Sequence, residues 1–359
     1  MKSANDWRGC ACCNAANRVT LGRRGLLKGT AGLAASAVAG PVLAQGAVAK
    51  PQRIDVHHHL SPPSWLPAVK KVGLDSPPAN NWTVEKSLAE MDRAGIDTSI
   101  LSLTQPALGF LGPKEAAAMA RDCNEFARGL ADRHPGRFGF FAILPMPHVD
   151  ETLTEIAYAL DVLKADGVGF MTNYGMKWLG HPDFMPVMQE LNRRKAVAYT
   201  HPNNVDCCVN LAGLPSVAIE YGTDTTRTIG DLIFSGAAAK LADVEFIFSH
   251  GGGTVTSLVE RFTIQLPSYP AFPQGKAFTA EGVMAQLRRF HYDTAQASNP
   301  IILSALTKMV ATSQILFGTD YPYRTAPEQV AGIRAFFKDA DLAAVEHGNA
   351  ARLMPRWAA

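Results

Sequence analysis

Short apolar segments alternate with longer segments of helical periodicity along the chain from Arg53 onward. Eight of the apolar segments have the length and residue types of β-strands. They are Arg53–His57, Ile96–Leu103, Phe138–Pro145, Gly167–Asn173, Ala196–Pro202, Glu245–Gly251, Phe290–Ala295 and Gln314–Pro322. This alternation is typical of βα units, in which helices join consecutive parallel strands. Eight such units in roughly 300 residues predict a (β/α)8 barrel of the TIM type.

The segments between the strands supply the helices that a barrel needs. Helical segments of suitable length are Thr83–Ala94, Lys114–Arg133, Val149–Lys164, Phe184–Arg194, Arg227–Lys240 and Ala326–Phe337. A doubly wound open sheet is the alternative, but no Gly-rich phosphate loop follows the first strand. Two longer segments, Ser61–Trp82 and Asn203–Asp224, predict loops over the barrel mouth, and the Pro-rich Gln265–Phe278 predicts a surface excursion.

The first 44 residues have a different character from the rest of the chain. The adjacent arginines Arg23 and Arg24 precede a weakly apolar, Ala- and Gly-rich stretch, Gly29–Leu43, that ends beside small residues suited to a signal peptidase. Adjacent arginines in this position resemble the twin-arginine export signal. We therefore expect the twin-arginine export machinery to take residues 1–44 as a signal peptide, and residues 45–359 to form a barrel domain that works in the periplasm or outside the cell.

The charge balance excludes some classes of partner. The chain has 34 basic and 32 acidic residues and a net charge of +2, which does not favour nucleic acid. No apolar run in the body of the chain reaches the length of a membrane-spanning helix, so we expect no integral membrane span in the mature protein.

Side chains able to bind a metal or move a proton stand at the ends of four predicted strands. The first strand ends in His57 and His59, the fifth in His201, the sixth in His250 and the eighth in Asp320. Because side chains alternate along a strand, His57 and His59 point to one face and His58 to the other. Active sites of such barrels lie at the C-terminal strand ends, so these side chains should converge. Three neutral imidazoles and one carboxylate suit zinc well, and manganese or iron less exclusively.

The motifs around these residues resemble those of the amidohydrolase superfamily. They are Asp55-Val56-His57-His58-His59, Thr200-His201-Pro202, Ser249-His250-Gly251-Gly252-Gly253 and Gly318-Thr319-Asp320-Tyr321-Pro322. Their order is similar to the branch that contains aminocarboxymuconate-semialdehyde decarboxylase and the aromatic-acid decarboxylases for resorcylate and methylsalicylate. The resemblance extends from about Arg53 to Arg356.

This resemblance implies a site with assigned roles. The implied metal ligands are His57, His59, His201 and Asp320, with His250 as the catalytic histidine that works with Asp320. Arg261 stands where the family places an arginine for a substrate carboxylate, and Arg227 lies in a segment that resembles part of the pocket. The segment Gly169–Asn173 has no lysine where binuclear relatives keep one that bridges two metals, so one divalent ion is expected. The resemblance also implies a homodimer.

The predicted reaction is nonoxidative decarboxylation of a small aromatic or unsaturated carboxylic acid. The metal would hold the substrate, and His250 and Asp320 would relay a proton to carbon. Asn173 and Tyr174, at the end of the fourth strand, are expected to contact the substrate. The same ligands also suit a hydrolase that opens a lactone or an amide with a metal-activated water, and hydration of a double bond is a third reading. Loss of His250 or Asp320 would have favoured an exported metal-binding or structural protein without catalysis, and both residues are present.

Overall fold

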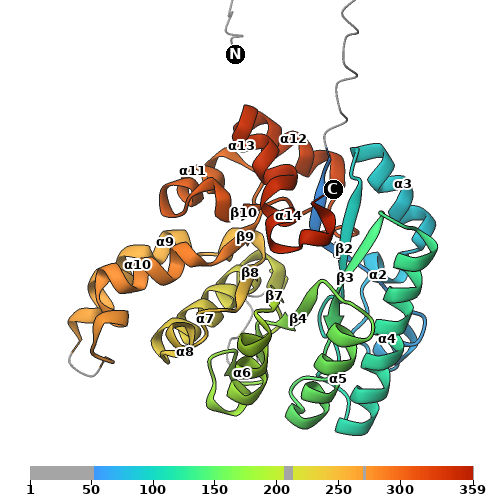
Figure 1. Ribbon diagram of the computed structural model, residues 1–359, viewed down its shortest axis with the longest axis horizontal. Coiled ribbons are helices and arrows are strands. Elements are labelled where there is room, and N and C mark those ends of the chain that lie inside the picture. Colours follow the sequence, from blue (N-terminus) through green and yellow to red (C-terminus); the bar gives the residue numbers. More distant parts are fainter. Residues whose placement is uncertain (1–51, 206–212, 270–271, 359) are drawn as a thin grey trace, which may run out of the picture. The chain divides into compact units, whose positions relative to one another are not determined.

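The computed structural model describes residues 52–205, 213–269 and 272–358. The predicted signal segment, residues 1–44, lies outside the described residues. Eight parallel strands of the described part form one sheet, in the order β1-β2-β3-β4-β7-β8-β9-β10 (Figure 1). They are β1 (Ile54–His59), β2 (Thr98–Ser102), β3 (Phe138–Ile143), β4 (Gly167–Met171), β7 (Val197–His201), β8 (Glu245–Phe248), β9 (His291–Asp293) and β10 (Ile315–Leu316). All eight predicted strands are therefore confirmed, most of them with shorter bounds.

The sheet closes on itself between β1 and the segment that follows β10. The amide of Val56 donates to the carbonyl oxygen of Phe317 at 3.0 Å, and the amide of Asp320 donates to His57 at 2.8 Å. A parallel bridge between His58 and Tyr321 continues the pairing. The first and last strands thus meet as a (β/α)8 barrel requires, which confirms the predicted fold class.

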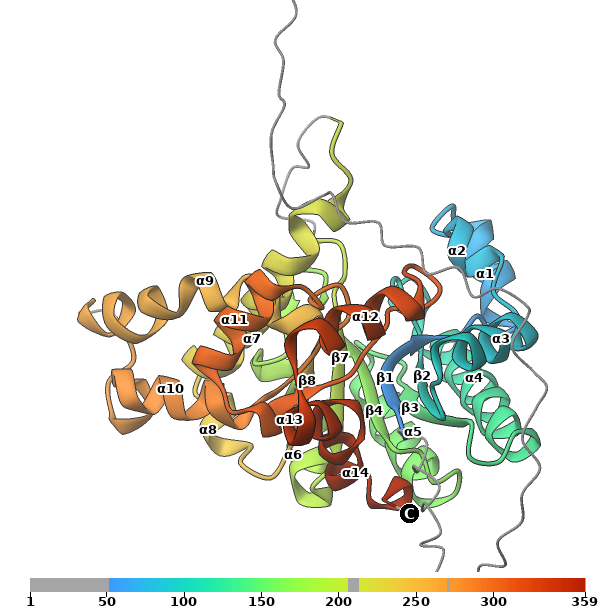
Figure 2. The ribbon, with the colours of Figure 1, turned by 90° about the horizontal axis from the view of Figure 1, so that it is seen from above.

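Helices surround the barrel (Figures 1 and 2). Along the first half of the chain they are α1 (Trp65–Lys71), α2 (Pro77–Asn80), α3 (Val84–Ala94), α4 (Pro113–Arg133), α5 (Val149–Asp161) and α6 (Met185–Arg194). The second half supplies α7 (Glu220–Phe234), α8 (Ala237–Lys240), α9 (Val255–Glu260), α10 (Ala280–Arg289), α11 (Pro300–Met309), α12 (Ala326–Phe336), α13 (Asp339–Ala343) and α14 (Asn349–Leu353). No described helix is both long enough and apolar enough to cross a membrane.

The prediction of a loop over Ser61–Trp82 was wrong, because this segment contains α1 and α2. Proline is favoured in the first turn of a helix, where no amide donor is needed. Pro77 and Pro78 are the first two residues of α2. The ring of Trp65 in α1 is buried, and its Nε1 donates to the carbonyl oxygen of Ala107 at 2.8 Å.

The predicted helix Arg227–Lys240 was misplaced at its start, because α7 begins at Glu220. The Thr- and Gly-rich start of this helix has low intrinsic helix propensity, so the sequence pattern alone does not indicate a helix there. Tertiary contacts hold it in place. The carboxylate of Asp224 accepts hydrogen bonds from Nδ2 of Asn173 at 2.6 Å and from Nε1 of Trp178 at 2.7 Å.

The barrel interior is packed with side chains. Its apolar cluster includes Ile54, Val56, Ile100, Phe141, Val197, Tyr199, Ile247 and Leu316, all buried. The rings of Phe141 and Tyr199 stack with their centroids 5.1 Å apart. This layer fills the barrel below the C-terminal ends of the strands. The polar residues at those ends therefore pack against a rigid, close-packed apolar core.

The predicted orientation of His58 is confirmed. Its Nε2 lies 2.5 Å from the hydroxyl oxygen of Ser87 in α3, outside the barrel, and its Nδ1 lies 3.0 Å from a carboxylate oxygen of Asp55. His57 and His59 therefore share the inner face of the barrel, where the candidate site lies.

Candidate active site

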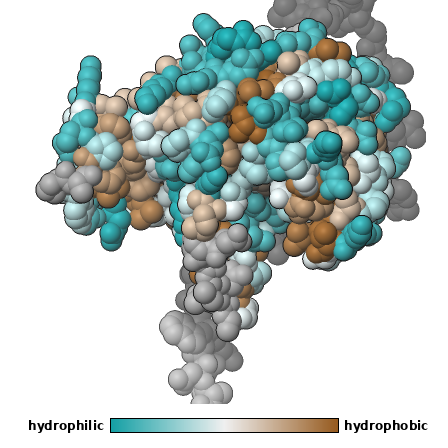
Figure 3. Space-filling model, turned by 90° about the horizontal axis from the view of Figure 1, so that it is seen from below, coloured by the Kyte–Doolittle hydropathy of each residue, from teal (hydrophilic) through white to brown (hydrophobic). Residues whose placement is uncertain are grey.

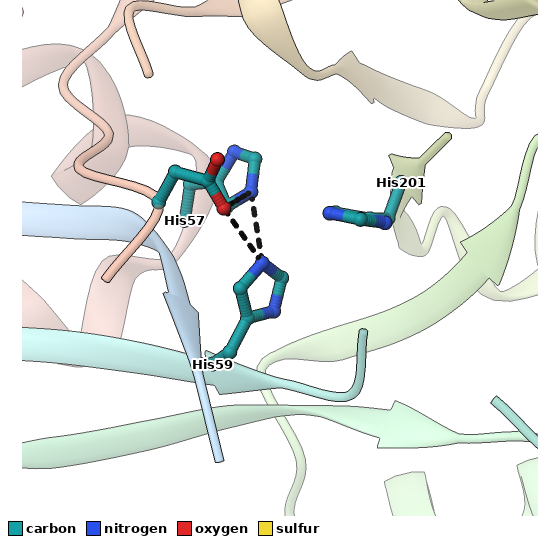
Figure 4. Close-up of side chains that lie close together, drawn as sticks. His57, His59 and His201 are labelled. Carbon is teal, nitrogen blue, oxygen red and sulfur yellow. Dashed lines mark hydrogen bonds and ion pairs between the residues drawn. The ribbon is translucent and has the colours of Figure 1, made fainter. Parts of the chain in front are cut away.

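Four polar side chains from three parts of the barrel meet at the C-terminal ends of its strands. The ligand atoms of His57, His59, His201 and Asp320 lie within 4.8 Å of one another, and all four residues are buried. The Oδ1 atom of Asp320 lies 3.0 Å from Nε2 of His59 and 3.2 Å from Nε2 of His57. Figure 4 shows the rings of His57, His59 and His201 arranged around one shared space. The structure thus brings together the four predicted ligands.

Each of these imidazoles is held through its Nδ1 atom. Nδ1 of His57 lies 2.8 Å from Oδ2 of Asp293, and Nδ1 of His201 lies 2.9 Å from the carbonyl oxygen of Pro202. Nδ1 of His59 faces the carbonyl oxygen of Ser102 at 3.2 Å. Since these partners only accept hydrogen bonds, each Nδ1 carries a hydrogen, and a neutral ring then has its lone pair on Nε2.

This arrangement fits one metal ion. The Nε2 atoms of His57 and His59 are 3.2 Å apart, with a carboxylate oxygen beside them, so when both rings are neutral these acceptors face one another without a donor between them. A cation resolves that repulsion, and three imidazoles with one carboxylate are an ordinary ligand set for divalent transition metals.

The electrostatics of the cluster also favour a positive charge at its centre. Burial lowers the pKa of the His57 imidazole, but the negative charges of Asp293 and Asp320 outweigh burial and raise that pKa to about 10. Burial and the two neighbouring imidazoles hold the pKa of His201 well below its usual value. Burial raises the pKa of Asp320, but the charge on His57 and hydrogen bonds from the histidines hold it well below the usual range.

We expect metal binding to release about one proton per ion at neutral pH. The raised pKa of His57 means that the metal-free protein keeps a proton on this ring below about pH 10, and a divalent cation must displace it. Affinity should therefore rise roughly tenfold per pH unit between pH 6 and 8. Calorimetry in buffers of different ionisation enthalpy measures the released proton. A binding enthalpy that is equal in all buffers would mean that His57 is neutral before the metal arrives.

His250 and Asp320 form a second pair beside this cluster. Nε2 of His250 lies 3.4 Å from Oδ2 of Asp320, while Oδ1 faces the other histidines. Both residues have a positive φ, 56° for His250 and 63° for Asp320. Residues in this conformation need support from their surroundings and occur often at functional sites. Asp320 thus contacts both the cluster that could hold a metal ion and the imidazole of His250.

A cavity of about 400 Å³ opens above these residues. It is lined by Thr104, Gln105, His201, Val217, Tyr221, His250, Gln296, Asp320, Tyr323 and Arg324. The amide of Gln105 donates to the hydroxyl oxygen of Tyr221 at 2.6 Å, which makes a polar wall. Arg324 is an ion-pair partner of Glu328 at 2.5 Å. The space suits a small molecule rather than a polymer.

The four residues predicted to bind substrate are not among those that line this cavity. Asn173 and Tyr174 line a different cavity, of about 570 Å³. Arg227 lies in α7, with NH1 at 3.6 Å from Glu220 and 3.9 Å from Asp224. Arg261 is exposed, and its NH1 donates to Gln265 at 3.4 Å. Their predicted roles in substrate binding stay predictions.

Comparison with known proteins agrees with this geometry. The family profile described as Amidohydrolase matches residues 54–356, which is most of the chain. The chain belongs to the amidohydrolase family. The resemblance seen in the strand-end motifs is thereby confirmed.

Known amidohydrolase-family proteins similar to this one include decarboxylases. The 6-methylsalicylic acid decarboxylase of Penicillium expansum is 37% identical over 281 residues, which cover 75% of this chain and 85% of that protein. Decarboxylase macB of Penicillium terrestre is 38% identical over 328 residues, which cover 85% and 95%. The crystal structure of a 5-carboxyvanillate decarboxylase from Novosphingobium aromaticivorans, with bound manganese, has a TM-score of 0.77 at 18% identity and covers 85% of this chain and 97% of that chain. This last likeness shows the shared fold.

Two residues of this amidohydrolase site, Asp293 and Gln296, were not predicted from the sequence. Asp293 ends β9 and contacts both His57 and the backbone of His250. Gln296 follows it, lines the cavity and donates to Oδ2 of Asp320. Asp293 could have been found, because it lies near the end of the predicted strand Phe290–Ala295, as the histidines lie near the ends of theirs. Gln296 gives no comparable signal, since it lies in a loop without a motif.

Proposed function

We propose that this amidohydrolase-family protein is a metal-dependent, nonoxidative decarboxylase of a small aromatic or unsaturated carboxylic acid. The observation that carries the proposal is the His250–Asp320 pair, which lines a cavity of about 400 Å³ beside a cluster able to hold one metal ion. The two relatives at 37% and 38% identity are named decarboxylases, which supports the same reaction class.

The chemistry requires a proton at carbon. A proton adds to the carbon that bears the carboxylate, the bond to the carboxylate then breaks, and its electron pair restores conjugation as carbon dioxide leaves. A divalent ion held by His57, His59, His201 and Asp320 would supply the positive charge that binds and polarises the acid. His250, on the cavity wall, would give the proton, and Oδ2 of Asp320, 3.4 Å from its Nε2, would stabilise the imidazolium form. His250 regains its proton from solvent, so one proton is consumed per turnover.

The experiment follows carbon dioxide and deuterium together. The metal-loaded protein is incubated in heavy water with methylsalicylates, dihydroxybenzoates, a muconate-type diacid and an aromatic lactone. We expect metal-dependent release of carbon dioxide from at least one acid, with one deuterium at the carbon that carried the carboxylate. Opening of the lactone without release of carbon dioxide would instead identify a hydrolase. Protein stripped with a chelator is the matched control, and its activity should return with added metal.

We further propose zinc as the native ion, with manganese as the alternative. Three imidazoles and one carboxylate favour zinc, whereas the 5-carboxyvanillate decarboxylase with the same fold was solved with manganese. Elemental analysis of protein purified without added metal distinguishes the two.

We propose a homodimer, in which Arg261 could bind substrate in the partner's cavity, since it does not line the cavity of its own barrel. The segment from α9 to α10 extends from one side of the barrel in both ribbon views (Figures 1 and 2). Ile264 and Tyr269 on this segment are 64% and 50% exposed, and Figure 3 shows hydrophobic surface at this end of the molecule. We propose that a second copy covers this surface and receives Arg261 near its own cavity. Light scattering of the wild type and of Ile264→Glu tests the dimer, which the charge should weaken.

Residues 1–44 are proposed to direct twin-arginine export, so that the mature enzyme works in the periplasm or outside the cell. Replacing both arginines, Arg23 and Arg24, by lysine should retain the protein inside the cell, as cell fractionation would show.

A further inference from the structure

Asp293 contacts both the metal-holding cluster and the neighbouring His250–Asp320 pair, but it belongs to neither group. These two groups are the two halves of the site. Asp293 ends β9, and no part of its side chain is exposed. Its Oδ2 atom lies 2.8 Å from Nδ1 of His57, on the metal-holding side. Its Oδ1 atom accepts hydrogen bonds from the backbone amides of His250 at 2.9 Å and Ala295 at 3.0 Å. One buried carboxylate thus spans from a predicted metal ligand to the predicted catalytic histidine.

Each of these contacts fixes something that the reaction needs. A carboxylate offers only acceptors, so Nδ1 of His57 must carry the hydrogen and Nε2 is left to face the shared space. On the other side, the amide of His250 is held while that residue adopts a φ of 56°, a conformation that needs support from outside the residue. The carboxylate therefore determines both the tautomer of one ring and the position of the other.

The neighbouring backbone is shaped to allow this contact. His57 and Asp293 leave no room for a side chain at Gly318, two residues after β10. A Cβ atom there would lie 2.9 Å from Cβ of His57 and 3.2 Å from Cγ of Asp293. Only glycine lets the two side chains approach each other at this point, so the pairing of His57 with Asp293 is built into the barrel closure.

We infer that Asp293 is a positioning residue that couples the metal-holding cluster to the His250–Asp320 pair. The part of this inference that concerns catalysis rests on the proposed decarboxylase function. The part that concerns metal binding does not, and it can be measured without any substrate.

The substitution Asp293→Asn tests the inference because it changes charge and hydrogen-bonding capacity but not shape. If the amide nitrogen faces His57, it donates to Nδ1, and the ring proton must move to Nε2, where it blocks a metal ligand. If the amide turns over, its nitrogen meets the backbone amides of His250 and Ala295, and two donors oppose each other. Either orientation leaves one half of the site without support.

We expect Asp293→Asn to bind zinc about 10- to 100-fold more weakly in competition with a chromophoric chelator. At saturating metal, kcat should fall while KM changes little, because Asp293 does not line the cavity. The matched control is Asp166→Asn. Asp166 is a buried carboxylate just before β4, at the opposite end of the barrel, and it accepts from the amide of Phe140 at 2.9 Å. The control should lose thermal stability and keep the metal affinity of the wild type.

Wild-type metal affinity and kcat in Asp293→Asn, with a loss of stability like that of Asp166→Asn, would overturn the inference. Should Asp293→Asn not fold, nitrogen-15 spectra of the zinc-loaded wild type still decide the point. We expect a hydrogen-bonded Nδ1–H on His57, and a bare Nδ1 would contradict the inference. If the wild type decarboxylates no acid at all, the proposed function fails, but the metal affinities of the variants still test Asp293.

Discussion

Asp320→Asn is expected to lower kcat by about 10³-fold or more and to weaken metal binding at the same time. The two oxygens of Asp320 serve different partners. Oδ1 lies 3.0 Å from Nε2 of His59, and Oδ2 lies 3.4 Å from Nε2 of His250. An asparagine must turn its amide nitrogen toward one of these groups, so it loses either a metal ligand or the acceptor that stabilises the imidazolium.

Metal content and kcat are measured on the same preparation of Asp320→Asn, and Asp183→Asn serves as the control. Asp183 is an exposed carboxylate paired with Lys177 on the surface, so its loss should change neither quantity. A folded Asp320→Asn protein with full metal content and full activity would refute both roles of this residue.

His250→Asn is expected to lower kcat by about 10²- to 10⁴-fold while metal content stays close to that of the wild type. His250 lies beside the cluster but is not one of its four members, and it lines the cavity. Removing the imidazole therefore takes away the proton donor and leaves the ligands in place. Asparagine keeps the backbone amide that donates to Asp293 and is tolerated at positive φ.

Two comparisons sharpen this prediction. His181→Asn removes a histidine from the surface, 36% exposed, and should be indistinguishable from the wild type. The double variant His250→Asn/Asp320→Asn should be no slower than Asp320→Asn alone, because groups that act as a unit are not additive. Multiplicative losses would show that the two residues act in separate steps.

Much of the fold follows from local pattern. The existence and approximate positions of the eight strands were predictable, because apolar runs of strand length are separated by amphipathic helices. The convergence of His57, His201 and Asp320 followed from one rule, that the C-terminal strand ends of a barrel meet at one face. Alternation along β1 also placed His58 outside the site.

The segments between the strands were harder to predict, because their local signals are ambiguous and long-range contacts decide their structure. The prolines of α2 signal a helix start as readily as a turn, and the weak propensity at the start of α7 is overcome by contacts of Asp224 with residues about 50 positions away. Asn173 was expected beside the substrate from its strand-end position, and this role stays a prediction. Its amide donates to Asp224, a contact that no local pattern indicates.

The sequence by itself determined the barrel and the convergence of its strand-end histidines with Asp320, because strand periodicity and strand direction are local properties. The resemblance of the strand-end motifs to the amidohydrolase superfamily then implied which four of these residues hold a metal. Only the tertiary structure decided which ring nitrogens face the metal, which oxygen of Asp320 faces His250, and that Asp293 contacts both halves of the site. These features depend on hydrogen bonds between residues as far apart as His57 and Asp293, and no local pattern encodes such distances.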